Sequence, residues 1–279
     1  MKKVAIQGIL GSFHDIAARI YFGDEISLIC CNTFEQLFDI VKTDPDVVGM
    51  CAIENTIAGS LLHNYELLRD SGAIISGEQK LRISHSLCCL PSDSLDTINE
   101  IHSHPVALMQ CRRFLSNLPT IKAVENDDTA GSARMIAEDK RSGWAAICHA
   151  DAAGIYGLKV LQNNIEDNKH NFTRFLVVSS PVNAFDITKT ERKNKASIVF
   201  SLPHEEGSLS SVLAILSFYK INLTKIQSLP IIGREWEYLF YVDVVFNDIA
   251  RYHQAIHAVT PLTKDLRILG EYCDGKQAG

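Results

Sequence analysis

The sequence predicts an α/β protein made of two parts. Strand and helix patterns alternate along the N-terminal half, which is typical of a largely parallel sheet. A polar stretch at residues 179–194 then interrupts the pattern. The segments after it follow the order βαββαβ, which is the order of a ferredoxin-like domain.

The N-terminal part begins with a strand at residues 3–7 and a helix that starts near Ser12. Ser12 and Asp15 fit a capping box in which Asp replaces the usual Glu. Apolar residues then recur at helical spacing: Ile16, Ala17, Ile20 and Tyr21. The expected elements that follow are strand 46–53, helix 61–69, strands 73–76, 81–90 and 97–103, helix 105–115, strand 121–124, helix 128–138 and strand 143–148.

Polar loops follow three of these strands, at residues 8–15, 54–60 and 103–105. In a parallel sheet, ligands bind beyond the carboxyl ends of the strands, where helix N-termini present free N–H groups. These loops are therefore the candidate walls of a binding site.

The polar stretch contains Pro181 and a charged cluster at residues 189–193, and we interpret it as a linker between domains. The elements expected after it are strand 196–202, helix 209–219, strands 222–232 and 236–246, helix 249–259 and strand 265–271. Alternate residues of the strand at 236–246 are apolar, which suits a sheet whose one face packs against two helices.

Composition excludes several classes of function. The chain of 279 residues has a formal net charge of −6 and no basic stripe, which argues against nucleic acid as a partner. The apolar run near the N-terminus is too short for a signal peptide, and no stretch approaches membrane-spanning length, so we expect a cytoplasmic protein. The histidine pairs 102/104 and 253/257 lack further metal-type ligands nearby, so no metal is expected.

Residues 168–176 place the hydroxyl of Thr173 beside the guanidinium of Arg174, with Phe172 and Phe175 on either side. Arg offers a fork of donors that matches a carboxylate or phosphate, and apolar neighbours exclude water and strengthen such pairing. Taken alone, the motif indicates an anion site at the start of a strand. A strand that begins with an ordinary surface Arg is the alternative.

Six short motifs occur together in this chain and in one known family. They lie at residues 8–18, 53–60, 77–85, 103–111, 145–158 and 171–175. With these motifs in this order, the chain resembles the prephenate dehydratase family over essentially its whole length. The C-terminal part is similar to the ACT regulatory domain of that family at residues 207–209, 222–224 and 228–230.

The resemblance implies a catalytic domain at residues 1–180 made of two α/β lobes, like a periplasmic binding protein, with the active site in the cleft. Lobe 1 would comprise about 1–80 and 160–180, with Thr173 on its last strand, and lobe 2 about 81–159. A linker at 181–194 and an ACT domain at 195–279 would follow. The implied form is the stand-alone enzyme, a homodimer or homotetramer.

The implied reaction converts prephenate to phenylpyruvate, CO2 and water without a cofactor, in phenylalanine biosynthesis. Arogenate dehydratase is a close alternative, and a non-catalytic amino-acid-binding regulatory protein is another. In the implied mechanism, Thr173 would donate a hydrogen bond to the leaving hydroxyl and Arg174 would bind a substrate carboxylate.

The remaining site residues are also implied by the resemblance. Asn55 and Thr56 would supply amide and hydroxyl contacts, and the N–H groups of Ser12 and Phe13 would hold the second carboxylate, unless Ser12 only caps its helix. The other expected substrate contacts are Ser103, Gln110, Thr129 and Phe175.

Phenylalanine would lower activity by binding the ACT domain. The residues implied for this effector are Gly207, Ser208, Leu209, Asn222 and Ser228. Gln227 and Leu229 stand where the family has Glu and Arg, which removes a possible ion pair near the effector.

Overall fold

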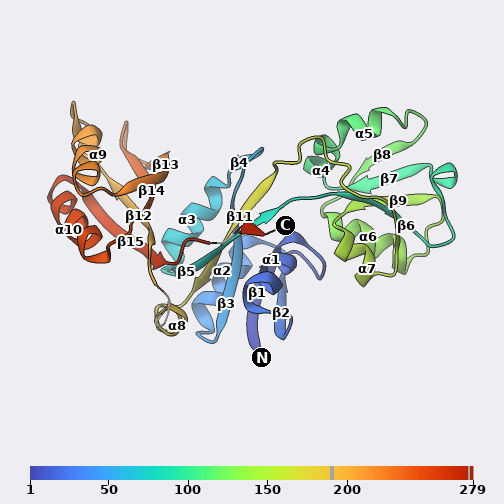
Figure 1. Cartoon of the computed structure of the whole chain (residues 1–279), viewed down its shortest axis with the longest axis horizontal. Helices are drawn as coiled ribbons and strands as arrows, with labels where there is room; N and C mark the ends of the chain where they lie inside the picture. Colours follow the sequence, from blue (N-terminus) through green and yellow to red (C-terminus); the bar gives the residue numbers. More distant parts are fainter. Residues whose placement is uncertain (189–191, 276, 279) are drawn as a thin grey trace.

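The computed structural model describes residues 1–188, 192–275 and 277–278. Three sheets lie in a row along the long axis of the molecule (Figure 1). We call the central unit, residues 1–82, 172–179 and 277–278, lobe 1. The unit at residues 86–162 is lobe 2, and the unit at residues 195–272 is the C-terminal domain.

Lobe 1 contains a mixed sheet in the order β16-β5-β11-β3-β1-β2, with β4 paired to β3. Its strands are β1 (Lys2–Gln7), β2 (Ile26–Cys31), β3 (Val47–Asn55), β4 (Gly59–Ser60), β5 (Ile74–Arg82), β11 (Phe172–Ser179) and β16 (Gln277–Ala278). Its helices are α1 (Phe13–Phe22), α2 (Phe34–Thr43) and α3 (Leu62–Ser71). The strand β11 returns from lobe 2 as the last strand of lobe 1, as expected, and it inserts between β3 and β5.

The prediction of two short strands at 73–76 and 81–90 was wrong, because β5 runs unbroken from Ile74 to Arg82. The residues between the two expected strands, 77–80, include the polar Glu78, Gln79 and Lys80. Glu78 and Gln79 are nevertheless buried, and Glu78 is paired with cations from two other segments. Long-range ion pairs therefore hold polar side chains inside this strand.

Lobe 2 contains the five-stranded sheet β10-β6-β9-β7-β8. Its elements are β6 (Ser86–Cys89), η1 (Leu95–Thr97), β7 (Glu100–Ser103), α4 (Pro105–Gln110), α5 (Arg112–Ser116), β8 (Lys122–Glu125), α6 (Thr129–Glu138), β9 (Trp144–Cys148), α7 (Ala150–Ile155) and β10 (Lys159–Gln162). The single helix expected at 105–115 is divided at Cys111, whose φ of −114° and ψ of 23° are not helical.

Two connections, at residues 83–85 and 163–171, join the lobes, and we call them the hinge segments. They pair with each other: the N–H of Ile83 donates to the carbonyl of Asn171 at 2.8 Å, and the N–H of Ile165 donates to the carbonyl of His85 at 2.9 Å. The two lobes are thus joined through a hydrogen-bonded double crossing.

The C-terminal domain has the predicted βαββαβ order. Its elements are β12 (Lys195–Ser201), α9 (Ser208–Phe218), β13 (Asn222–Pro230), β14 (Tyr238–Val245), α10 (Ile249–Val259), η2 (Thr260–Leu262) and β15 (Lys264–Tyr272). Its antiparallel sheet has the order β13-β14-β12-β15. Residues 181–194, expected as a linker, begin with the helix α8 (Pro181–Thr188), in which Ala184 is buried. Residues 189–191 of the charged cluster lie outside the described residues.

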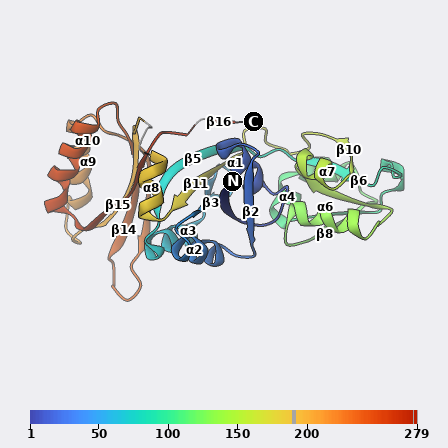
Figure 2. The ribbon, with the colours of Figure 1, turned by 90° about the horizontal axis from the view of Figure 1, so that it is seen from below.

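The sheet of the C-terminal domain is covered on both faces (Figure 2). Val242, Val244 and Phe246 pack against α9 and α10. On the opposite face, Tyr241 and Leu269 share one apolar core with residues of lobe 1, which include Tyr65, Leu68 and Leu176. The C-terminal domain is therefore packed onto lobe 1 through a continuous hydrophobic core.

A close backbone contact accompanies this core. At Gly270 of β15, a Cβ atom would lie 2.1 Å from the carbonyl oxygen of Ile75 in β5. Only glycine permits this approach, because any larger residue would collide with main-chain atoms. The contact fixes how closely the two sheets can pack.

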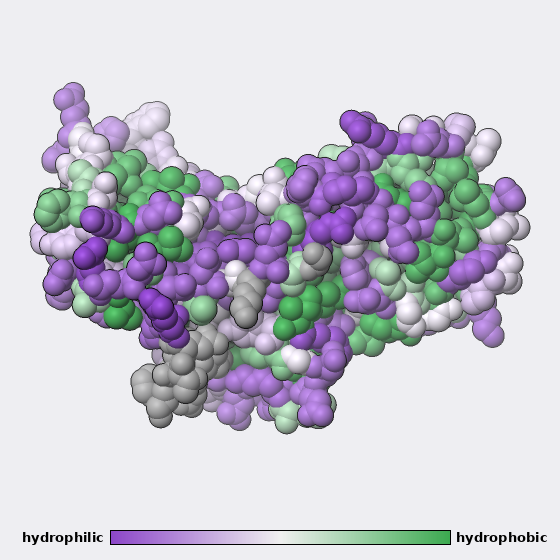
Figure 3. All heavy atoms as spheres, viewed as in Figure 1, coloured by the Kyte–Doolittle hydropathy of each residue, from purple (hydrophilic) through white to green (hydrophobic). Residues whose placement is uncertain are grey.

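Polar residues cover much of the face seen in Figure 3, and the upper edge of the molecule dips between the C-terminal domain and lobe 2. Among the described residues, no helix is both long and apolar enough to cross a membrane.

Candidate active site

A cavity of about 330 Å³ lies between the two lobes. It opens at the carboxyl ends of β1 and β3, where Gln7 and Asn55 line it. Its walls are Gln7, Ser12, Phe13, His14, Ala52, Asn55, Ala58, Leu61, Ile83, His85, His104, Val106, Ala107, Gln110, Asp127, Asp128, Thr129, Thr173 and Phe175. Seven of the residues expected at the site are among them: Ser12, Phe13, Asn55, Gln110, Thr129, Thr173 and Phe175.

The N-terminus of α1 forms one wall of the cavity. The Oγ of Ser12 accepts a hydrogen bond from the N–H of Asp15 at 3.4 Å, so Ser12 caps the helix. The N–H of Ser12 donates to the carbonyl of Ile9 at 3.0 Å. The expectation that this N–H binds a carboxylate was therefore wrong, because the turn before the helix already uses it. The ring of Phe13 meets His85 edge-on, with centroids 5.7 Å apart.

Thr173 faces the cavity and has a defined hydrogen-bond partner. The Oδ1 of Asn55 accepts the N–H groups of Ile57 and Ala58 at 2.9 and 2.8 Å, which fixes the orientation of this amide. The Nδ2 of Asn55 therefore points to Thr173 and donates to its Oγ1 at 2.9 Å. Because Oγ1 already accepts from Asn55, the hydroxyl proton of Thr173 is left for a ligand in the cavity.

Gln110 extends this arrangement from lobe 2. Its Oε1 accepts from the Nδ2 of Asn171 at 3.1 Å and lies 2.9 Å from the Nε2 of His85. No described group accepts from the Nε2 of Gln110, which leaves its two N–H donors for a ligand. Three helices also begin at the cavity, and the residues that cap them line it: Ser12 for α1, His104 for α4 and Asp128 for α6.

The charges at the cavity come from acids and helix ends. None of the described arginines or lysines lines it, whereas Asp127 and Asp128 do. Burial lowers the pKa of His14 to about 4, so this ring is neutral at pH 7. Its Nε2 accepts from the N–H of Ala52 at 3.2 Å, which also requires the neutral form.

Arg174 does not reach this cavity, and the expectation that it binds a carboxylate there was wrong. Successive residues of a strand point to opposite faces, so Arg174 points away from the side that Thr173 faces. It lines a second cavity of about 380 Å³, between lobe 1 and the C-terminal domain. Thr56 lines this second cavity as well, with its hydroxyl bonded to the carbonyl of His170 at 3.2 Å and to the N–H of Phe172 at 2.9 Å.

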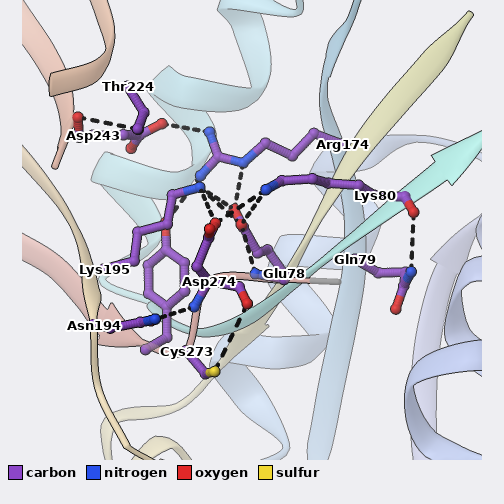
Figure 4. Close-up of polar contacts among 12 residues, drawn as sticks. Glu78, Gln79, Lys80, Arg174, Asn194, Lys195, Thr224, Asp243, Cys273 and Asp274 are labelled. Atoms are coloured by element: carbon purple, nitrogen blue, oxygen red, sulfur yellow. Dashed lines mark hydrogen bonds and ion pairs between the residues drawn. The ribbon is translucent and has the colours of Figure 1, made fainter. Parts of the chain in front are cut away.

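Arg174 belongs to a group of charges that joins lobe 1 to the C-terminal domain (Figure 4). We call Glu78, Arg174, Lys195, Asp243 and Asp274 the interdomain charge cluster. The Nε of Arg174 binds Glu78 at 2.6 Å, and its Nη1 binds Asp243. The Nζ of Lys195 binds Glu78 at 2.8 Å and Asp274 at 3.0 Å.

Glu78, Lys195 and Asp243 of this cluster are buried, and the charges of the cluster compensate one another. Burial alone would raise the pKa of Glu78, but Arg174 and Lys195 more than offset this and hold that pKa below its usual value. Tyr272 adds a hydrogen bond from its hydroxyl, which accepts from the Nη2 of Arg174 at 2.9 Å. The guanidinium therefore serves the contact between domains.

Ser103 is also absent from the cavity walls, contrary to expectation. Its hydroxyl is fully buried and donates to the carbonyl of Ile147 at 2.6 Å, between the neighbouring strands β7 and β9. Conversely, the sequence analysis did not assign His14, His85 or His104 to the site. All three histidines lie within shared motifs, at residues 8–18, 77–85 and 103–111, and this membership was the available signal.

The effector residues expected in the C-terminal domain do not form one group within this chain. Gly207, Ser208 and Leu209 lie at the N-terminus of α9, and Asn222 begins β13 after its C-terminus. The 11 residues of α9 separate the two ends by roughly 16 Å, at about 1.5 Å per residue. Leu229 is buried in the core shared with lobe 1, whereas Ser228 is exposed.

Comparison with known proteins identifies related sequences. The model of the prephenate dehydratase family matches residues 4–183. Arogenate dehydratase/prephenate dehydratase 6, chloroplastic, of Arabidopsis thaliana is 36% identical over 97% of this chain and 68% of its own length.

Two solved structures are similar over nearly the whole chain. One is the prephenate dehydratase of Arthrobacter aurescens in complex with L-Phe, with a TM-score of 0.83 and 27% identity over 97% of this chain and 90% of that one. The other is GqqA, described as a novel type of quorum quenching acylase, with a TM-score of 0.85 and 29% identity over 98% of both chains.

Proposed function

The chain belongs to the prephenate dehydratase family, and we propose that it converts prephenate to phenylpyruvate, CO2 and water. The observation that carries this proposal is the orientation of Thr173 in the interlobe cavity. Its Oγ1 accepts from Asn55 at 2.9 Å, so its O–H is free to donate to a leaving hydroxyl.

In the reaction, the bond from the ring to its carboxylate breaks and its electron pair enters the ring, which becomes aromatic. The C–O bond to the ring hydroxyl breaks at the same time, and the departing oxygen takes up a proton, supplied by the solvent, to leave as water. A hydrogen bond from Thr173 stabilises the charge that develops on this oxygen. Thr173 acts as an oriented donor, because an alcohol is too weak an acid to supply the proton unaided.

The substrate is a dianion, and we propose that helix ends and amide donors bind its two carboxylates. The first turns of α1 and α6 begin at the cavity, and the N-terminus of a helix favours negative charge. Phe13 and Thr129 are the residues that would present these N–H groups. Gln110 adds its side-chain donors from lobe 2, and Phe175 supplies an apolar wall that limits access of water.

Arogenate is the second candidate substrate, and one observation favours it. Arogenate carries an ammonium group where prephenate has a keto group, and Asp127 and Asp128 line the cavity without an arginine or lysine among its described walls. A carboxylate there could pair with that ammonium group. Assays with both substrates would give the ratio of the two kcat/KM values.

Hydrolysis of an amide, as the name of GqqA suggests for that protein, needs a nucleophile beside a base. The partner of the Thr173 hydroxyl is an amide N–H donor, which cannot accept its proton. The environment of the Thr173 hydroxyl therefore favours dehydration over acylase chemistry at this group.

The test is purified protein mixed with prephenate, followed by the absorbance of phenylpyruvate. We expect turnover by the wild type and a fall in kcat of about 10²–10⁴ in Thr173→Val, with an unchanged melting temperature. Thr173→Ser is the matched control because it keeps the hydroxyl. Full activity of the valine variant would remove Thr173 from the mechanism. Binding without turnover by the wild type would instead favour a non-catalytic amino-acid-binding protein.

For regulation, we infer that the C-terminal domain is an ACT domain that binds phenylalanine and lowers activity. The Arthrobacter relative is described in complex with L-Phe. Because α9 separates Leu209 from Asn222, a site that uses both ends would take them from two copies of the chain. This fits a homodimer or homotetramer, and light scattering with and without phenylalanine would test it.

The cytoplasm is the location that we propose. It rests on the sequence, since the structure shows only that no described helix could span a membrane.

A further inference from the structure

A chain of hydrogen bonds with a fixed direction runs along the interlobe cavity. It starts at the backbone N–H groups of residues 57 and 58, which orient the amide of Asn55. Asn55 then donates from Nδ2 to the Oδ1 of Asn171 at 2.8 Å, as well as to Thr173. The amide of Asn171 is thereby oriented too, with its Nδ2 as the next donor.

The same reasoning fixes Gln110. Asn171 donates from Nδ2 at 3.1 Å, so the atom of Gln110 that receives it must be the oxygen Oε1. The Nε2 of His85 lies 2.9 Å from that same oxygen. A carbonyl oxygen can only accept, so the proton of the neutral His85 ring must be on Nε2.

We propose that His85 is a positioning residue for the substrate: together with Asn171 it holds the Oε1 of Gln110, so that both N–H donors of Gln110 face the cavity. This inference rests on the proposed function. It explains how the site can bind an anion without a described arginine or lysine in its walls. Among the described groups, the side-chain oxygens of Asn55, Asn171 and Gln110 all accept hydrogen bonds within the protein, so the amides of this chain leave only donors for the ligand.

The surroundings of His85 fit this role. The residue is 2% exposed, and among the described groups its Nδ1 is buried without a hydrogen-bond partner. Phe13 covers the ring edge-on. Burial lowers the pKa of His85, which keeps the ring neutral at pH 7. A neutral ring with its single proton on Nε2 cannot rotate to offer Nδ1 without losing the bond to Gln110.

The tautomer can be measured without any enzymatic assay. Long-range ¹⁵N–¹H correlation spectra of the uniformly labelled protein distinguish a protonated from an unprotonated ring nitrogen. We expect Nε2 of His85 to be protonated and Nδ1 to be bare, and the signals are assigned by their loss in His85→Gln. A proton on Nδ1 would overturn the proposal.

Kinetics of three variants test the effect on the substrate. His85→Gln keeps an N–H donor at the distance of Nε2, His85→Asn carries the same amide one methylene shorter, and His85→Leu has no donor. We expect KM to rise about tenfold in the Leu and Asn variants, because a loss of about 1.4 kcal/mol in substrate binding corresponds to this factor when Gln110 is no longer held in place. In His85→Gln, KM should stay within about threefold of the wild type. An equal rise in the Gln and Asn variants would overturn the proposal. That polar pair decides the matter even if His85→Leu fails to fold.

A double variant separates positioning from general packing. If His85 acts through Gln110, then His85→Asn should raise KM no further in a Gln110→Leu background. Independent, additive effects would refute this route of action. Failure of the proposed function would be visible separately, because the wild-type protein would then not consume prephenate, and the tautomer measurement would still stand.

Discussion

Replacing Arg174 by methionine tests whether this guanidinium serves the domain contact or the substrate. Methionine keeps an apolar stem and removes the donors to Glu78, Asp243 and Tyr272. The two acids are 2% and 4% exposed, so water cannot replace the lost cation. Removing one partner of a buried ion pair costs about 3–5 kcal/mol.

The lower end of that range applies, because Lys195 still neutralises Glu78 at 2.8 Å. We therefore expect Arg174→Met to lose about 3 kcal/mol of stability. At about 2–4 °C per kcal/mol for a chain of this size, the melting temperature should fall by roughly 10 °C.

The assay combines thermal unfolding with steady-state kinetics. Arg234→Met is the matched control, since the side chain of Arg234 is 55% exposed and its pair with Glu237 lies at the surface. An exposed pair contributes about 0–1 kcal/mol, so this control should melt within about 4 °C of the wild type. Below its melting temperature, Arg174→Met should keep KM for prephenate within about twofold. A KM raised more than about tenfold at an unchanged melting temperature would refute the reasoning and return Arg174 to the substrate.

Three further predictions concern other parts of the structure. The pKa of His14 is lowered to about 4 from an ordinary value of 6.5, so the unfolded chain binds a proton that the folded one does not. The stability that this group contributes is fully present above pH 6.5 and is lost as the pH falls toward 4. The loss amounts to roughly 2–3 kcal/mol. Urea unfolding at pH 7.5 and pH 4.5 should show this loss in the wild type and a smaller one in His14→Ser. Gly270→Ala should weaken the packing of the C-terminal domain on lobe 1, because the new Cβ would lie 2.1 Å from a carbonyl oxygen. Gly154→Ala is the control, since a Cβ there meets nothing within 4 Å. Limited proteolysis should cleave the Gly270 variant faster than the control, and equal rates would contradict the close contact. Ser103→Ala should lower stability by about 1–3 kcal/mol, because the carbonyl of residue 147 loses its hydrogen bond from the Ser103 hydroxyl. The variant should keep kcat within about threefold of the wild type. A loss of turnover without a loss of stability would show that Ser103 contacts substrate.

Local signals in the sequence predicted much of the fold. The Ser12 cap and the helix at 249–259 both agree with the structure, because each depends on neighbours along the chain. The order βαββαβ was confirmed for the same reason. Only the middle of β5 was missed, because the buried Glu78 is stabilised there by ion pairs with residues about 100 positions away, which no local pattern reveals.

The candidate site was predicted in part. Asn55, Gln110 and Thr173 line the cavity as expected. The prediction that Thr173 and Arg174 both line this cavity was wrong. Strand geometry already argues against it, because neighbouring residues of a strand face opposite sides. The proposed contribution of His85 depends on a contact with Gln110, 25 positions away, which forms only when the hinge segment packs against α4 of lobe 2.

The core shared by lobe 1 and the C-terminal domain has a practical consequence for cutting the protein into pieces. Separate expression of residues 1–180 would uncover Tyr65, Leu68 and Leu176, which the C-terminal sheet now shields from water. The isolated C-terminal piece would likewise expose Tyr241 and Leu269. Both fragments would expose apolar surface and tend to aggregate. We therefore expect the chain to fold as one unit, and not as a catalytic domain with a separable regulatory domain.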